Sequence, residues 1–346
     1  MKRAKKISEL RQDLVTGAWV VIATGRAKRP DQFVRKDKQK IPPKSGCPFE
    51  RLIPNALLVV DKKGERYRLT KKDLPYLKKN WFVEVVPNKY PAFGRGVCQV
   101  ERKLGPHHWM DGVGFHEVII TRDHARPIAL MTQKEVESVV IAYRERYLAL
   151  KDEDCVEYIS IFHNHGREAG ASIFHPHSQL IATPVIPPDV ARSLKGSAQY
   201  AHSNKGRCVH CAMLEFELKD GRRIVYENRY FVALCPYVSR AAFEVRIFPK
   251  LHNPRFEVSQ DDDLPFFADA FRAALAKLYR GLMDPHHNFF LHTAPTANTK
   301  EFNSYHWHME IVPKTAIWAG FEISTGMDIS TIAPERAAEF LRKTKV

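Results

Sequence analysis

Apolar residues recur along this chain in two patterns, one typical of strands and one typical of helices. Residues 115–124 form a β-branched run that predicts a strand ending at His124. Thr132 and Glu135 then have the spacing of a capping box, which indicates the start of a helix. The residues that follow at helical spacing, and so predict one buried face, are Val136, Val139, Val140, Tyr143 and Tyr147.

The same order of patterns occurs again in the second half of the chain. Residues 243–252 form another β-branched run that closes on a histidine, His252. Ser259 to Asp262 come next, and the apolar face that follows consists of Phe267, Phe271, Leu275 and Leu278. Each half continues with an apolar strand, residues 158–162 and 288–292, and then a His-x-His pair, His175/His177 and His306/His308.

Four ordered matches in near-constant register indicate a duplicated chain. Short links between strands favour antiparallel pairing. We therefore expect an α+β fold of two similar halves, each with an antiparallel sheet and one main helix. The expected division is residues 1–195 and 196–346.

Composition restricts the class of protein. The 346 residues are 44% hydrophobic and 27% charged, which is typical of a globular protein. We expect no membrane association and no secretory leader, since no 18-residue apolar stretch exists and no apolar segment follows the basic N-terminus. Of the six cysteines only Cys208 and Cys211 lie close in sequence, a pattern that does not resemble a disulfide framework and favours a reducing, cytoplasmic location. The formal charge of +15 indicates anionic partners.

Cys208 and Cys211 are spaced so that one tetrahedral ion can bind both thiolates. His252 and His306, which occupy the duplicated positions, complete a set that favours zinc. A redox pair is the alternative, but the thioredoxin-like strand–helix–strand context for it is missing. The duplication predicts a matching first-half set.

That first-half set consists of Cys47, Glu50, His124 and His175. Zinc accepts carboxylate oxygen, so Glu50 can replace a second cysteine. The alternative is that Cys47 is a small buried residue and His124 caps a turn. Each ion would connect strands that lie far apart in the sequence.

Residues 162–179 predict phosphate chemistry. Gly166 and Gly170 allow backbone amides to approach an anion, and Ser172, Ser178 and Gln179 supply neutral donors. In an extended segment His175 and His177 point the same way, so one can bind metal while the other faces a substrate. Neutral imidazole is a good phosphoryl nucleophile, the role we expect for His177.

With these motifs, the chain resembles the galactose-1-phosphate uridylyltransferases of the histidine-triad superfamily along nearly its whole length. Similar segments are residues 11–22, 26–30, 88–91, 164–179, 306–308 and 320–322. The paired cysteines resemble the two-zinc branch, which also includes ADP-glucose phosphorylase-like proteins. Glu50 stands where that family usually has cysteine.

The resemblance implies a ping-pong reaction in which His177 takes UMP from UDP-glucose and passes it to galactose 1-phosphate. It implies that Gln179 binds the phosphoryl group of the intermediate, and that a nucleotide sugar and a sugar 1-phosphate are the partners. It assigns substrate contacts to Arg26, Arg29, Asn88, Asn164, Ser172, Phe321 and Glu322. Phe321 and Glu322 resemble a tail that reaches into the site of a partner subunit, which implies a homodimer.

Three alternatives remain open at the level of the sequence. One is phosphorolysis of ADP-glucose or another nucleotidyl exchange through the same histidine. Another is a duplicated histidine-triad protein that only hydrolyses or binds nucleotides. The third is a zinc-stabilised nucleic-acid-binding protein, which we do not expect because the basic runs are not interleaved with stacking aromatic residues.

Overall fold

The computed structural model describes residues 7–23, 30–35, 40–98, 101–297 and 299–346. Its strands are β1 (Glu9–Gln12), β2 (Trp19–Ile22), β3 (Leu58–Asp61), β4 (Arg66–Tyr67), β5 (Trp81–Pro87), β6 (Arg102–Leu104), β7 (His107–Trp109), β8 (Phe115–Thr121), β9 (Tyr158–His165), β10 (His177–Thr183), β11 (Ile224–Glu227), β12 (Phe231–Leu234), β13 (Val245–Pro249), β14 (His287–His292), β15 (His308–Pro313) and β16 (Ile329–Ser330). Its helices are α1 (Leu74–Asn80), α2 (Gln133–Leu150), α3 (Pro188–Ser203), α4 (Val209–Asp220), α5 (Leu264–Leu282), α6 (Gly320–Thr325) and α7 (Pro334–Lys343), with short 3₁₀ turns between them.

One 11-stranded sheet carries both halves, in the order β11-β12-β13-β15-β14-β9-β10-β8-β5-β3-β4. Its strand pairs are antiparallel, and β8, β9 and β10 of the first half correspond to β13, β14 and β15 of the second. The halves meet where β14 pairs with β9, with Asn288 opposite Asn164. The expected α+β fold and its duplication are confirmed, but the two sheets are continuous.

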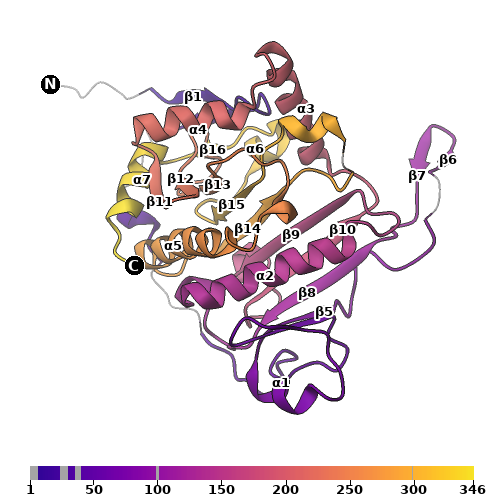
Figure 1. Cartoon of the computed structure of the whole chain (residues 1–346). Helices are drawn as coiled ribbons and strands as arrows, with labels where there is room; N and C mark the ends of the chain where they lie inside the picture. The colour runs from indigo at the N-terminus through magenta and orange to yellow at the C-terminus, as the bar shows by residue number, and fades with distance from the viewer. Residues whose placement is uncertain (1–6, 24–29, 36–39, 99–100, 298) are drawn as a thin grey trace.

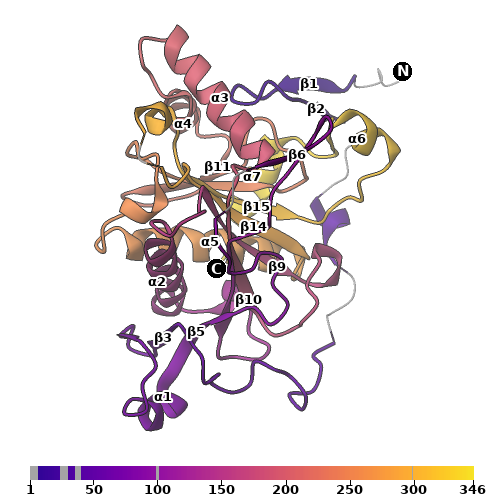
Figure 2. The same cartoon turned by 90° about the vertical axis from the view of Figure 1, so that its right-hand side faces the viewer.

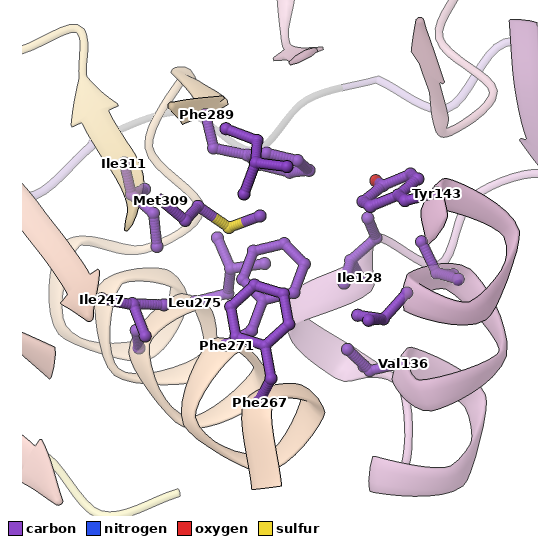
Figure 3. Close-up of a cluster of buried hydrophobic side chains, with 14 of the residues drawn as sticks. Ile128, Val136, Tyr143, Ile247, Phe267, Phe271, Leu275, Phe289, Met309 and Ile311 are labelled. Carbon is purple, nitrogen blue, oxygen red and sulfur yellow. The ribbon is translucent and has the colours of Figure 1, made fainter. Parts of the chain in front are cut away.

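The main helices α2 and α5 lie side by side on one face of this sheet (Figure 1; Figure 2). Figure 3 shows Tyr143 and Val136 of α2 opposite Phe267 and Phe271 of α5, beneath strand residues such as Phe289. Replacing a buried phenylalanine such as Phe271 with alanine costs about 3–5 kcal/mol in such a core. The helices therefore hold the two halves together through one shared core.

The capping box at the start of α2 is confirmed. Thr132 N donates to Glu135 Oε2 at 2.8 Å, and Glu135 N donates to Thr132 Oγ1 at 3.3 Å. The corresponding helix α5 begins after Asp263, with a proline in its first turn. Ser259 to Asp262 thus precede the helix and do not cap it.

The predicted division between residues 195 and 196 falls inside α3. The link between the halves is therefore helical there, and the domain assignment itself stays a prediction. Outside the repeat, β1, β2 and β16 form a small separate sheet. In the described part of the chain, no helix combines the length and apolar character needed to cross a bilayer.

Cys98 and Cys155 form a disulfide across 57 residues of sequence. A single bridge is not a disulfide framework, but the sequence did not predict this pair. Their separation in sequence gave no signal, because the fold brings the loop after β5 to the turn before β9. The remaining cysteines, Cys47, Cys208, Cys211 and Cys235, are free thiols.

Candidate active site

His177 is the first residue of β10, and its ring is held by the backbone. Its Nδ1–H donates to the carbonyl oxygen of His175 at 2.9 Å. In the neutral ring, that bond leaves the lone pair on Nε2. His177 is 8% exposed, and burial lowers the pKa of its imidazole. The arrangement presents a neutral nitrogen nucleophile.

His177 faces the side of the sheet opposite the main helices. Its neighbour Ser178 pairs with His163 across β9 and β10, and Ser178 Oγ lies 2.6 Å from Tyr143 Oη of α2. Since side chains alternate along a strand, His177 and Gln179 lie on the other, open face. Asn164, adjacent to His163 on β9, shares that open face.

The Asn164 carboxamide is fixed from the second half of the chain. Asn288 Nδ2 donates to Asn164 Oδ1 at 2.8 Å and to the carbonyl oxygen of Ala169, also at 2.8 Å. The Asn164 oxygen is thus occupied, and its amide group is left as a donor. Asn288 was not identified from the sequence, because only the pairing of β14 with β9 brings it here.

The turn between β9 and β10 needs the glycines that the sequence singled out. Gly166 has φ 82° and Gly170 has φ 88°, in the region that favours glycine. A Cβ at Gly166 would overlap the ring of His286. Ser172 lies exposed in the loop that follows, between this turn and β10.

Gln179 and Asn88 meet at a third side chain, His116 of β8. His116 Nε2 lies 2.9 Å from Gln179 Oε1 and 3.0 Å from Asn88 Nδ2. His116 was missed in the sequence, although strand alternation places it on the same face as Val118 and Ile120. These two residues pair opposite Gln179 and His177, respectively.

The remaining residues expected to bind substrate are Arg26, Arg29, Phe321 and Glu322. Arg26 and Arg29 lie outside the described residues. Phe321 and Glu322 are in α6, where Glu322 Oε2 accepts from Ala319 N at 3.0 Å. Glu322 and Asn164 line one cavity of about 960 Å³.

The second-half metal set is assembled by the fold. The ligand atoms of Cys208, Cys211, His252 and His306 all lie within 4.8 Å of one another. Cys211 Sγ is 3.4 Å from His252 Nδ1 and 3.5 Å from His306 Nδ1. Hydrogen bonding from Cys211 lowers the pKa of the Cys208 thiol, which favours the thiolate that a metal binds.

The first-half set is assembled in the same way, with Cys47, Glu50, His124 and His175 within 4.8 Å. His124 Nδ1 is 2.5 Å from Glu50 Oε1, and His175 Nδ1 is 3.6 Å from Cys47 Sγ. The fold thus brings together both sets of residues that the sequence proposed as ligands, including the one with a carboxylate.

All four cluster histidines are oriented alike. Each donates its Nε2–H to a backbone carbonyl oxygen and directs Nδ1 toward the cluster. The acceptors are Pro42 for His124, Thr121 for His175, Asn303 for His252 and Pro249 for His306. Metal-binding histidines typically have such a partner on the second nitrogen, so both donor sets fit a metal ion.

The second-half position equivalent to His177 is different. His308 Nδ1 donates to the His306 carbonyl at 3.0 Å, as in the first half. Two residues later, however, Glu310 replaces glutamine and forms ion pairs with Arg240 and Arg246. Burial would raise the pKa of Glu310, but Arg246 and Arg240 hold it well below its usual range. This cluster, with His292, was not identified from the sequence.

Comparison with known proteins yields several matches. A family profile described as "Galactose-1-phosphate uridyl transferase, N-terminal domain" matches residues 1–187. ADP-glucose phosphorylase from Arabidopsis thaliana is 32% identical, covering 98% of this chain and 93% of that protein. Galactose-1-phosphate uridylyltransferase from Thermotoga maritima is 31% identical, covering 98% and 99%.

A solved structure is similar over the same length. It is an ADP-glucose phosphorylase from Arabidopsis thaliana with bound ADP-glucose, 30% identical, with a TM-score of 0.79. The similarity covers 98% of this chain and 100% of that one. Both halves of the sheet are therefore shared with this structure.

Proposed function

Because the chain belongs to the galactose-1-phosphate uridylyltransferase family, we propose that it transfers a nucleoside monophosphate through a covalent intermediate on His177. The observation that supports this most directly is the His177 ring, which is buried, neutral and held through Nδ1 with Nε2 directed away from the backbone. A positioned neutral nitrogen is what nucleophilic attack on phosphorus requires.

In the first step, His177 Nε2 attacks the α-phosphorus of a nucleotide sugar. A P–N bond forms, the bond from this phosphorus to the bridging oxygen breaks, and a sugar 1-phosphate leaves. The ring becomes cationic, and the bond from Nδ1–H to the His175 carbonyl oxygen strengthens as that charge develops. A phosphorylated acceptor reverses the step and releases the enzyme.

The side chains around His177 supply neutral hydrogen-bond donors. Gln179 and Asn164 have their oxygens occupied by His116 and Asn288, so their amide groups remain free for phosphoryl oxygens. Phosphoryl transfer depends mostly on such positioning and charge stabilisation. Arg26, Arg29, Asn88 and Ser172 remain proposed substrate contacts.

Both histidine-containing clusters fit zinc by donor type and histidine orientation. Zinc would be bound by Cys208, Cys211, His252 and His306 in the second half, and by Cys47, Glu50, His124 and His175 in the first. It would contribute structural cross-linking there. His175 would then fix the segment that carries the carbonyl acceptor for His177.

For the donor and acceptor we propose UDP-glucose and galactose 1-phosphate, as the name of the Thermotoga maritima relative suggests. ADP-glucose phosphorolysis is the second candidate, supported by the similarity of the Arabidopsis thaliana enzyme over 98% of the chain. A cytoplasmic homodimer remains our expectation for the assembled protein.

Mass spectrometry of the intact protein tests both the covalent intermediate and the identity of the donor. After incubation with UDP-glucose or ADP-glucose alone, we expect one nucleoside monophosphate adduct on the parent and none on His177→Gln. His308→Gln is the matched control, since His308 has the same backbone bond but the Glu310 ion pairs beside it. It should form the adduct as the parent does.

The mass of the adduct identifies the donor. A UMP adduct supports uridylyl transfer, and an AMP adduct overturns it in favour of adenylyl transfer. If neither donor labels the parent, or if His177→Gln is labelled equally, the covalent mechanism is wrong. Adding galactose 1-phosphate or inorganic phosphate to the isolated adduct then shows which acceptor discharges it.

A further inference from the structure

His116 lies on the open face of the sheet, one strand away from the nucleophile. It is opposite Ile181 in the pairing of β8 with β10, two residues beyond Gln179 on the same face. Its backbone carbonyl accepts from Asn88 N at 2.8 Å, so the loop after β5 is attached at the same point. The imidazole thus stands between that loop and Gln179.

The hydrogen bonds of the ring determine where its proton is. Ala92 N–H donates to His116 Nδ1 at 3.1 Å, so Nδ1 must carry a lone pair. In the neutral ring the hydrogen is then on Nε2. Nε2 lies 2.9 Å from Gln179 Oε1, which accepts from it. A backbone amide, which cannot reverse its role, therefore fixes the tautomer.

We propose that His116 is a positioning residue that holds the Gln179 carboxamide with its amide group, not its oxygen, available to the transferring phosphoryl group. The proposal rests on the proposed function of His177. A terminal carboxamide rotates readily between two orientations that differ only in which end is donor. Without His116, the Gln179 oxygen could face phosphoryl oxygens and repel their charge.

The loop after β5 also packs against the ring. Asn88 Nδ2 also lies 3.0 Å from His116 Nε2, but both groups carry hydrogen in this tautomer, so this approach is a packing contact and not a hydrogen bond. The ring therefore touches both carboxamides that the sequence assigned to substrate binding, Asn88 and Gln179. The hydrogen bond from Ala92 in turn keeps the ring from rotating, so the loop determines how Gln179 is presented.

Two substitutions distinguish the roles of the two ring nitrogens of His116. In His116→Gln, the side-chain amide can replace Nε2 and donate to Gln179, although the acceptor for Ala92 is lost. In His116→Asn, the oxygen can replace Nδ1, but the side chain is too short to reach Gln179. We expect His116→Gln to form the nucleotidyl adduct within about 3-fold of the parent rate, and His116→Asn to be about 10- to 100-fold slower.

The rate of the chemical step should fall while donor affinity changes little, because the Gln179 contact matters most as charge develops. In a Gln179→Ala background, His116→Asn should then change the rate less than 2-fold, since its effect passes through Gln179. A merely structural role would slow both backgrounds equally. Equal rates for His116→Asn and the parent, or equal slowing by His116→Asn and His116→Gln, would overturn the proposal.

Selective ¹⁵N-histidine labelling tests the geometry without any reaction. The His116 signals, identified by their loss in His116→Asn, should report a neutral ring with its hydrogen on Nε2 in the unliganded protein. A hydrogen on Nδ1 overturns the proposal even if His177 forms the adduct. Conversely, failure of the parent to form any adduct refutes the covalent mechanism while this tautomer measurement still decides the assignment for His116.

Discussion

The chemistry of His177 depends on its low exposure as much as on its hydrogen bond. Desolvation disfavours the imidazolium, so the pKa of His177 is lowered from its ordinary value near 6.5. The backbone bond to His175 opposes this shift but does not cancel it. His177 is therefore unprotonated over a wider pH range than an exposed histidine would be.

This shift predicts a pH profile for adduct formation that is displaced to lower pH. An exposed imidazole at pH 6 would retain only about a quarter of its neutral form. With a lowered pKa, His177 should retain more than this quarter of its pH 8 rate at pH 6, and its rate should fall at lower pH than that of an exposed histidine. Rapid-quench mass spectrometry with saturating donor measures the rate, and a half-maximal point near pH 6.5 would contradict the assignment.

Residue types and their spacing indicated the proposed ligands and the proposed nucleophile, but not the side chains that contact them. His177, Cys208 and Cys211 occur in motifs whose spacing carries the chemistry. His116 contacts Gln179, and Asn288 contacts Asn164, each from a neighbouring strand. Only the pairing of the strands therefore brings them to the site. Nothing local in the sequence distinguishes such a residue from any other polar residue in a strand.

At the level of elements, each cluster brings a segment outside the main sheet next to the start of one of its strands. Cys47 and Glu50 lie in the loop before β3, and they meet His175 just before β10. Cys208 and Cys211 similarly attach the start of α4 to His306 just before β15. Each cluster therefore fixes the start of a strand that carries the second histidine of a His-x-His pair.

If both clusters hold zinc, the purified protein should contain about two ions per chain. Cys211→Ser and Cys47→Ser should each lower this to about one, and each should lower the melting temperature because a cross-link is lost. Metal analysis by mass spectrometry, with scanning calorimetry, measures both. Cys235→Ala is the control, since Cys235 is buried outside the clusters. Two ions retained in Cys47→Ser would refute the first-half site.

The elements themselves were predictable where the pattern is local. The capping box of Thr132 and Glu135 located the start of α2, because its hydrogen bonds lie within four residues. The analogous Ser259 gave no such signal for α5, where Asp263 precedes the helix. The small sheet of β1, β2 and β16 joins the two ends of the chain, so no window of sequence could reveal it.

For the whole molecule, duplication did not produce two equivalent sites. The segment between β14 and β15 contains no glycine, whereas the one between β9 and β10 contains Gly166 and Gly170. Glu310 places a carboxylate where the first half has Gln179, and a carboxylate repels phosphate. The sequence showed the repeat, but only the continuous sheet shows that both pseudo-equivalent positions share one open face.

Several apolar side chains in and just before α6 are exposed to solvent in a single chain. Ile317 is 93% exposed, Trp318 64% and Ile323 74%, around the α6 residues Phe321 and Glu322. Uncovered apolar groups of this size favour association. They agree with the expected homodimer in which the tail of one subunit completes the site of the other.

A mixed dimer tests this arrangement. His177→Gln lacks the nucleophile and Glu322→Ala lacks the tail carboxylate, so each homodimer should transfer poorly. If Glu322 acts in the partner's site, a dimer of one subunit of each kind contains one site with both residues intact. Its turnover with a nucleotide sugar and acceptor should reach about half that of the parent, because one of two sites is complete.

Tandem affinity tags isolate the mixed species, and light scattering confirms that it is a dimer. If Glu322 acts only within its own chain, neither site is complete, and the mixed dimer would remain as inactive as its parents.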